Sequence, residues 1–187
     1  MKRTMAIKST IFKATLQVAD MDRHYYADHA LTIARHPSET DERMMIRCLA
    51  FALHASDSLA FGKGLSDVDD PDLWQRDLTG AIQLWIEVGQ PDERQILRAC
   101  GRSDQVLVYA YSASAMLWWK PIADKLERTR NLMVRAVPAP AAARLAKLAA
   151  RAMDLQCTIH GGEVWMRNES DAVQIELTTL LEPSRGL

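Results

Sequence analysis

Two segments of the sequence carry oxygen-bearing side chains at a spacing that could bind a metal ion. The first holds Glu39 and Glu42, and the second holds Gln83 and Glu87. Alternate side chains of a strand share one face, so a strand over residues 82–87 would present Gln83 and Glu87 together. A helix that begins at Ser38 would place Glu39 and Glu42 beside its buried edge. Converging carboxylate and amide oxygens suit a hard cation such as Mg²⁺, which can polarise a phosphodiester and activate water.

The same side chains also have an ordinary structural explanation. Gln83, Trp85 and Glu87 alternate with three aliphatic residues, which is typical of a sheet with one polar face and one face toward the core. Glu39 and Glu42 would suit the positive end of the helix dipole in a first turn. The spacing therefore locates a candidate site and leaves both interpretations open.

The elements that must position these residues follow from hydrophobic periodicity. Alternation from Phe12 to Val18 predicts a strand that pairs with a second strand over 25–34, and Ser38 as N-cap predicts a helix to about Ala55. Further strands are expected over 59–65, 82–87, 106–111, 132–137, 155–159, 164–167 and 173–179, and further helices over 91–100, 113–126 and 140–153. The strand, helix and strand over 82–111 predict one parallel unit. This mixture predicts an α+β fold, with a mixed β-sheet flanked by helices.

Length and composition fit one globular domain over residues 1–187. No apolar run approaches the roughly 20 residues that span a bilayer, and the first nine residues hold no secretory signal, so we expect a cytoplasmic protein without a membrane partner. The net charge of −1 does not itself predict nucleic-acid binding, although a local basic rim can exist on a neutral protein. The three cysteines are far apart and show no zinc or disulfide spacing, so we interpret them as structural.

Four motifs resemble the signature of the YaeQ family of small proteobacterial proteins. They are the segments 34–45 (ARHPSETDERMM), 71–75 (PDLWQ) and 84–93 (LWIEVGQPDE) and the pair Trp118-Trp119. The likeness runs from the first expected strand, at residues 10–15, through the last, so it covers nearly the whole chain. The resemblance implies a variant of the PD-(D/E)XK, or restriction-endonuclease-like, core with extra β-strands.

In nucleases of that fold, a helix acid, an aspartate and a (D/E)-x-K strand hold a metal and position the attacking water. The resemblance matches the helix acid to Glu39 or Glu42 and the strand acid to Glu87 or to the position of Gln83. A Pro-Asp pair also occurs, at Pro71-Asp72, within an expected acidic loop over 66–72. On this resemblance, Glu42 and Glu87 are the expected metal ligands, and the expected cofactor is Mg²⁺.

The sequence departs from that pattern at two positions. Gly89 stands where a lysine is expected, and Gln83 is an amide where relatives more often carry an acid. A lysine from elsewhere, Lys13 or Lys120, could take over the role, and Gln90 could orient a water. Catalysis therefore depends on a substitute for the missing lysine.

Three functional hypotheses follow. The first is metal-dependent phosphodiester hydrolysis on nucleic acid, with the candidate catalytic residues Glu39, Glu42, Gln83, Glu87, Gln90 and Lys120. The second is a non-catalytic module that keeps the nuclease fold and binds nucleic acid or a protein. The third is a scaffold whose exposed tryptophans mark a partner surface. The tryptophans Trp85, Trp118 and Trp119 have two other interpretations, stacking on bases or packing in a core.

Overall fold

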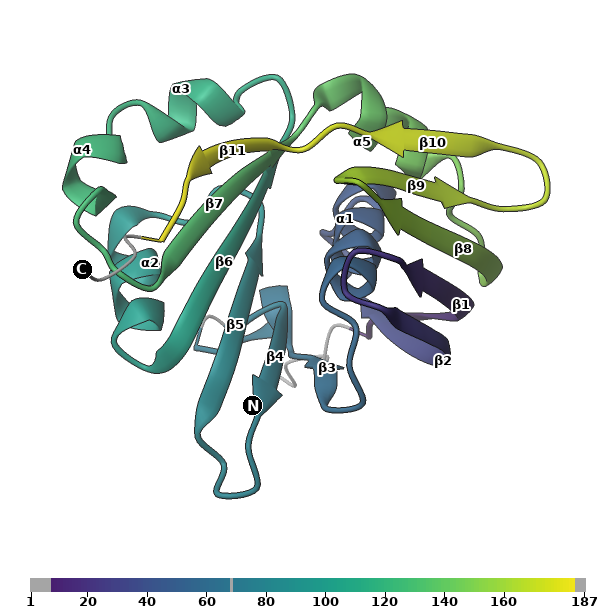
Figure 1. Ribbon diagram of the computed structural model, residues 1–187, viewed down its shortest axis with the longest axis horizontal. Helices are drawn as coiled ribbons and strands as arrows, with labels where there is room; N and C mark the ends of the chain where they lie inside the picture. Colours follow the sequence, from purple (N-terminus) through teal and green to yellow (C-terminus); the bar gives the residue numbers. More distant parts are fainter. Residues whose placement is uncertain (1–7, 68, 184–187) are drawn as a thin grey trace, which may run out of the picture.

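Helix α1 (Asp41–Leu53) lies between two β-sheets in the computed structural model, which describes residues 8–67 and 69–183 (Figure 1). The first sheet has the strand order β10-β9-β8-β1-β2, with bounds Ala172–Ile175, Glu163–Arg167, Ala152–His160, Thr10–Asp20 and Tyr25–Arg35. The second has the order β11-β7-β6-β5-β4-β3, with bounds Thr178–Leu181, Leu132–Val137, Ser103–Tyr111, Ile82–Val88, Leu73–Arg76 and Leu59–Phe61. The remaining helices are α2 (Glu93–Cys100), α3 (Ala115–Trp119), α4 (Ala123–Leu126), α5 (Ala139–Ala146) and the 3₁₀ turn η1 (Gly64–Ser66).

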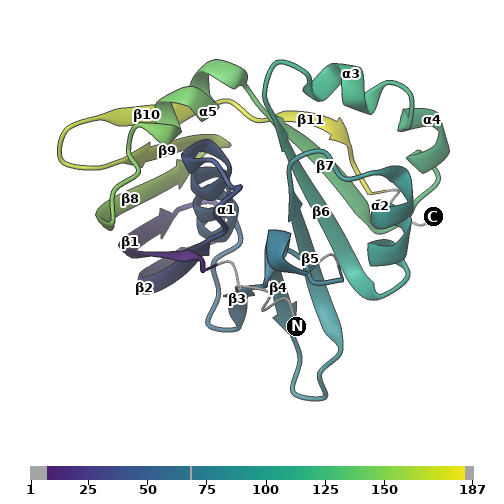
Figure 2. The ribbon, with the colours of Figure 1, turned by 180° about the vertical axis from the view of Figure 1, so that it is seen from behind.

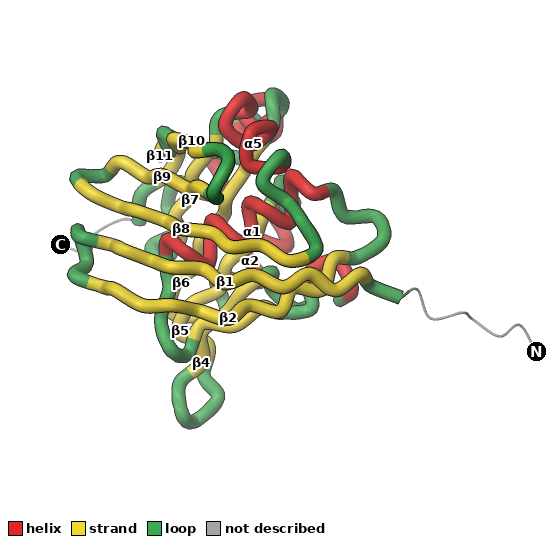
Figure 3. The backbone as a smooth tube through the Cα atoms, turned by 90° about the vertical axis from the view of Figure 1, so that its right-hand side faces the viewer, coloured by secondary structure: helices red, strands yellow, loops and turns green. Residues whose placement is uncertain are grey.

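Both sheets are mixed. In the first sheet β1 pairs antiparallel with β2 along its whole length and parallel with β8, and these three strands run side by side in Figure 3. In the second sheet β5, β6 and β7 are parallel, while β4 is antiparallel to β5. The expected α+β class with mixed sheets flanked by helices is therefore confirmed. The expected parallel unit β5–α2–β6 is confirmed as well.

Helix α1 is buried on every side because both sheets pack against it. All residues from Met44 to Leu53 are buried, which fits a helix whose sequence is apolar around most of its circumference. The expected start at Ser38 is wrong. The N-cap is Thr40, whose Oγ1 accepts a hydrogen bond from the Arg43 amide at 3.1 Å, so Glu39 precedes the helix.

Strand β5 is buried on both faces, which corrects the expectation of a polar outer face. Leu84 and Ile86 belong to the core between the sheets. Trp85 is only 3% exposed and belongs to a second core on the other side, where α2, α3 and α4 cover the sheet (Figure 2). A strand covered by helices on both faces is the usual situation in parallel β-α-β units.

Several boundaries differ from the sequence-based expectation. The expected strand 59–65 ends at Phe61. The helix 113–126 is divided into α3 and α4 around Pro121, where the sequence predicts a bend or a restart. The helix expected to reach Met153 ends at Ala146, because residues from Ala152 onward pair with β1 as β8. The strands β4 and β11 were not expected. The N-terminal segment 1–7 and Val68 of the acidic loop lie outside the described residues.

Two fold-wide expectations concern cysteines and membranes. All three cysteines are free, with Cys48 and Cys157 buried and Cys100 half-buried, as expected of structural residues. Across residues 8–67 and 69–183, we find no helix that combines the length and the apolar character needed to cross a membrane.

Helix α2 depends on a capping box that we expect to be worth about 1 kcal/mol. The Asp92 carboxylate accepts from the Gln95 amide at 2.8 Å, and the Gln95 side chain accepts from the Asp92 amide at 2.9 Å. Asp92→Ala should lower the free energy of unfolding by about 1 kcal/mol in urea denaturation. Arg94→Ala, an exposed change in the same helix, should cost below about 0.5 kcal/mol. Equal losses in the two variants would contradict this role for the cap.

Candidate functional site

A pocket of about 510 Å³ opens at the carboxyl ends of the parallel strands β5 and β6. Its lining comes from these strand ends, from α1, from the start of α2 and from the loop around η1. Its polar residues include Arg43, Asp67, Asp70, Glu87, Gln90, Ser112 and Ser114. Ligands commonly bind at this end of parallel strands, because the loops that follow the strands gather polar groups there. This pocket is therefore the candidate site.

Glu87 is a half-buried carboxyl group of this pocket that belongs to strand β5. It stands two residues after Trp85, on the same face of β5, and Trp85 Nε1 donates a hydrogen bond to its Oε1 at 2.7 Å. Burial raises the pKa of Glu87 to about 7, the nearby Asp72 adds to the rise, and the Trp85 hydrogen bond and Arg43 oppose it. A carboxyl group with a pKa near neutrality can take up and release a proton under physiological conditions.

Asp72 is a fully buried carboxylate that precedes β4. Its backbone amide donates to Ile86 O at 3.0 Å although Leu73 is the ladder partner of Ile86, so the chain departs from the regular β4–β5 register at Asp72. Its Oδ2 accepts from the Val88 amide at 2.7 Å. Burial raises the pKa of Asp72, whereas Arg43 and the Val88 amide lower it. The sequence had indicated this residue only through its Pro-Asp pair.

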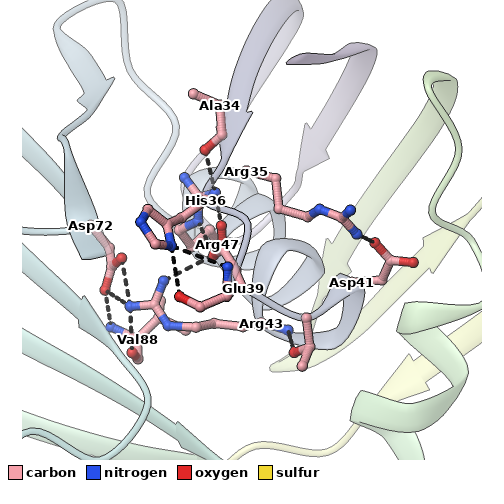
Figure 4. A network of polar contacts seen from close by, with 11 residues as sticks. Ala34, Arg35, His36, Glu39, Asp41, Arg43, Arg47, Asp72 and Val88 are labelled. Carbon is pink, nitrogen blue, oxygen red and sulfur yellow. Dashed lines mark hydrogen bonds and ion pairs between the residues drawn. The ribbon is translucent and has the colours of Figure 1, made fainter. Parts of the chain in front are cut away.

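The guanidinium of Arg43 joins the acids that flank the pocket (Figure 4). Its Nη2 donates to both Asp72 carboxylate oxygens at 2.8 Å and to Val88 O at 3.1 Å, while Nη1 donates to Glu39 Oε1 at 2.9 Å. Burial alone lowers the pKa of Arg43, but Asp72 and Glu39 raise it above its ordinary value. The side chain is only 13% exposed and remains a fixed positive charge.

Glu39 is buried and neutralised from two sides. Arg47 donates to it through Nε at 2.8 Å and Nη2 at 2.7 Å, in addition to the bond from Arg43. Arg47 Nη2 also donates to Ala34 O at 3.0 Å, which ties α1 to β2. Glu39 lines a second pocket of about 270 Å³ rather than the one that contains Glu87, and Arg43 lines both pockets.

Among the remaining expected site residues, the structure brings only Gln90 to the pocket. Gln90 Nε2 donates to Ser112 Oγ at 3.2 Å and Ser114 Oγ at 3.0 Å. Gln83 is exposed and accepts from Gln75, and it lies four residues, or about 13 Å, along β5 from Glu87.

Glu42 and the two lysines lie elsewhere. Glu42 is half-buried in the first turn of α1 and does not line the pocket. Lys120 is exposed at the end of α3, and Lys13 is exposed on β1 in the first sheet. The structure thus joins Glu87 and Gln90 with Asp72, and it separates them from Glu42, Gln83 and both lysines.

The metal-binding capacity of the site depends on few ligands. Within residues 8–67 and 69–183, no three or more histidine, cysteine, aspartate or glutamate side chains are arranged to hold a metal ion. Magnesium commonly takes only one or two carboxylates and completes its coordination with water and substrate phosphate. The Asp72 carboxylate and the Val88 carbonyl are the oxygens that come together in this way, since all three of their oxygen atoms accept from Arg43 Nη2.

The tryptophans are mostly structural. Trp85 and Trp119 are buried in the second core, so they present no face on which a base could stack. Trp118 is half-buried and donates from Nε1 to Pro91 O at 2.8 Å, which fixes the segment before α2. These contacts explain why the Trp118-Trp119 pair belongs to the framework of the pocket.

Comparison with known proteins identifies relatives over nearly the whole chain. A family profile described as YaeQ protein matches residues 5–177. The uncharacterized YaeQ protein of Salmonella typhi is 44% identical over 181 residues, which cover 96% of this chain and all of that protein. The Escherichia coli K12 protein is 42% identical with the same coverage.

Two crystal structures share the fold described above. The YaeQ protein from Xanthomonas axonopodis pv. citri superposes with a TM-score of 0.90 at 47% identity, covering 94% of this chain and 99% of that one. The YaeQ protein from Pseudomonas syringae gives a TM-score of 0.90 at 36% identity, covering 93% and 97%. Both the sequence and the arrangement of helices and strands place this chain in the YaeQ protein family.

Proposed function

We propose that the pocket is a variant PD-(D/E)XK site that hydrolyses phosphodiester bonds of nucleic acid with a divalent cation such as Mg²⁺. The observation that carries the proposal is the position of Asp72, from the Pro71-Asp72 pair. Its Oδ2 accepts from the amide of Val88, the residue after Glu87, and its charge contributes to the raised pKa of Glu87. These two residues would correspond to the motif acids of that nuclease pattern, and the fold brings them near each other although they lie 15 residues apart in sequence (72 to 87).

The charge of the pocket supports a cation requirement. Asp67, Asp70 and Glu87 line it, and Arg43 is the only cationic side chain among its described lining residues. Arg43 is already paired with Asp72 and Glu39, and the exposed Lys63 pairs with Asp67 and Asp70 at 3.6 and 4.0 Å. A phosphate in the pocket would therefore meet carboxylates and cations that are already paired with them. A bound cation would reverse this local charge and polarise the phosphodiester. Asp72 and the Val88 carbonyl would hold it, and Glu87 would remain free to exchange a proton.

Residues of the pocket can also replace the missing lysine. Gly89 has a φ of 113°, a backbone conformation that side chains rarely adopt, so a lysine at this position would be strained. Gln90 follows directly and presents its amide to the pocket through Ser112 and Ser114. Gln90 would orient the attacking water, and Glu87, with a pKa of about 7, would take up its proton.

The proposal predicts Mg²⁺- or Mn²⁺-dependent cleavage of labelled DNA or RNA by the purified protein. Glu87→Gln and Asp72→Asn should each lower the cleavage rate by about a hundredfold or more and weaken calorimetric cation binding. Glu163→Gln, which removes an exposed carboxylate from β9, is the matched control and should cleave normally. No cation binding, or cleavage unchanged by Glu87→Gln, would refute the proposal.

A second candidate function is a non-catalytic module that binds nucleic acid or a protein. The observation that favours it is the Arg43 guanidinium, which already neutralises Asp72 without any metal. This function predicts salt-dependent binding of DNA or RNA that persists in Glu87→Gln and is not followed by cleavage. Turnover on any nucleic acid that is lost in Glu87→Gln would exclude it.

A further inference from the structure

The cationic Nη2 of Arg43 sits among three oxygens behind the pocket that contains Glu87. Both carboxylate oxygens of Asp72 lie at 2.8 Å and the Val88 carbonyl oxygen at 3.1 Å. We propose that Arg43 is a built-in occupant of the divalent-cation site, and that a metal ion binds only when this guanidinium moves away. The identity of the cation rests on the proposed function, whereas the occupancy by Arg43 rests on the contacts themselves.

These three oxygens, here called the oxygen cage, are held independently of Arg43. Asp72 is fixed by the Val88 amide at its Oδ2 and by its own amide to Ile86 O, and the Val88 carbonyl belongs to the end of β5. Carboxylate and carbonyl oxygens are the preferred ligands of Mg²⁺ and Ca²⁺, at distances of roughly 2.0–2.6 Å. A small contraction of the oxygen cage would therefore be enough to replace a nitrogen with a metal ion.

The guanidinium has a second place to go. Arg43 lines both the pocket of Glu87 and the second pocket of about 270 Å³, where Glu39, His36 and Lys63 also lie. Its Nη1 is already bonded to Glu39 at 2.9 Å on that side. A rotation toward the second pocket would keep one ion pair while it releases Asp72.

Charge balance makes the two occupants exclusive. Asp72 is fully buried, and a buried carboxylate requires a positive partner, which either Arg43 or a metal ion supplies. A phosphate in the second pocket would offer the guanidinium the two-pronged contact that arginine prefers. Substrate phosphate and metal ion would then enter together, and the resting site would stay free of both.

Removal of the guanidinium should expose the cation site. In Arg43→Gln, we expect the calorimetric Kd for Mn²⁺ to be at least about tenfold lower than in the wild type. In the wild type Arg43 would leave the site open in under about one-tenth of the molecules, and this raises the apparent Kd by the same factor. Arg43→Gln should also melt at a lower temperature than the wild type, since Asp72 loses its partner. Addition of Mn²⁺ should raise the melting temperature of Arg43→Gln by more than it raises that of the wild type.

The Asp20–Arg23 pair of the first sheet provides the matched control. Asp20 is 2% exposed and accepts from Arg23 Nε, whereas the Ala55 carbonyl accepts from a different nitrogen, Nη1, at 3.2 Å. The oxygens around Arg23 are therefore not gathered at one nitrogen as they are at Arg43 Nη2. Arg23→Gln should therefore lose stability without any recovery by Mn²⁺. In the double variant Arg43→Gln with Asp72→Asn, the gain in Mn²⁺ affinity should disappear.

Each outcome decides the proposal. If Arg43→Gln fails to fold, refolding that succeeds in Mn²⁺ but not in NaCl of equal ionic strength supports it. Failure in both salts, together with wild-type Mn²⁺ affinity in the charge-keeping variant Arg43→Lys, overturns it. Folded Arg43→Gln with unchanged Mn²⁺ affinity also overturns it. If Arg43→Gln shows unchanged Mn²⁺ affinity but the wild-type protein cleaves nucleic acid, the proposed function stands and only the role of Arg43 is excluded. If Arg43→Gln binds Mn²⁺ tightly but the wild-type protein does not cleave nucleic acid, the role of Arg43 stands and the proposed function is excluded.

Discussion

Replacing Arg47 by methionine is expected to lower the free energy of unfolding by about 3 kcal/mol. Arg47 is 4% exposed and holds Glu39 through two hydrogen bonds of 2.7–2.8 Å, so its loss leaves a buried carboxylate with fewer partners. The effect should fall at the lower end of about 3–5 kcal/mol, because Arg43 still donates to Glu39. Methionine keeps the apolar packing of the arginine stem. Urea denaturation followed by circular dichroism at neutral pH measures the difference.

A surface ion pair provides the comparison for Arg47. Arg144 and Asp171 are 50% and 44% exposed, so Arg144→Met should cost below about 1 kcal/mol. The double variant of Glu39→Gln and Arg47→Met should lose less stability than the sum of its two single variants, since each single change strands the other member of the pair. A loss for Arg47→Met no larger than that of Arg144→Met would contradict the structural importance of this buried pair.

The position of Glu87 could be predicted from the sequence because it depends on local alternation. Successive residues of β5 point to opposite sides, and the run from Ile82 to Glu87 shows this pattern without any tertiary information. What local alternation could not give is the cover on each face. Trp85 lies under α2, α3 and α4, and those contacts join segments that are far apart in the chain.

Asp72 is hard to recognise as a site residue from the sequence because the strand that follows it is short. Strand β4 has four residues, and its place in the sheet depends on pairing with β5 and β3 rather than on its own periodicity. The preceding segment 66–72 is rich in aspartate and therefore has the composition of a loop. The Pro71-Asp72 pair was the one sequence signal that could have identified it.

Glu39 lies outside the helix expected from the sequence because two residues compete for the capping position. Ser38 has the right side chain for an N-cap, but its hydroxyl contacts His36 Nδ1 at 2.6 Å, while the Thr40 hydroxyl accepts from the Arg43 amide. Because the helix begins two residues later, Glu39 lies outside it, whereas Glu42 remains in its first turn. Glu39 therefore leaves the helix and turns to Arg47, a pairing that no local pattern specifies.

Replacing Glu87 by glutamine should stabilise the folded protein at pH 8 by about 3 kcal/mol, even though it removes the proposed proton acceptor. The pKa of Glu87 is about 7 in the folded protein, against an ordinary value of 4.5, because burial and Asp72 disfavour the ionised form. Each unit of pKa difference corresponds to about 1.4 kcal/mol, which gives roughly 3 kcal/mol in total. Glutamine has no charge to bury and keeps an oxygen that accepts from Trp85 Nε1.

The sign of the pH dependence separates this effect from ordinary packing. Below about pH 4.5 Glu87 is protonated in the folded and unfolded chains, so wild type and Glu87→Gln should be nearly equally stable there. Between about pH 4.5 and 7 the folded chain holds more protons than the unfolded one, and the wild type alone loses the contribution of this group. Urea unfolding at these pH values, with Glu163→Gln as the surface control, measures the difference between variant and wild type.

The outcome also bears on the proposed role of Glu87. A difference that does not grow with pH would show that Glu87 ionises freely in the fold. Glu87 would then lack the raised pKa on which its proposed role as proton acceptor depends. A growing difference would mean that the fold gives up stability to hold a carboxylate at the pocket, which is the expected cost of a functional group.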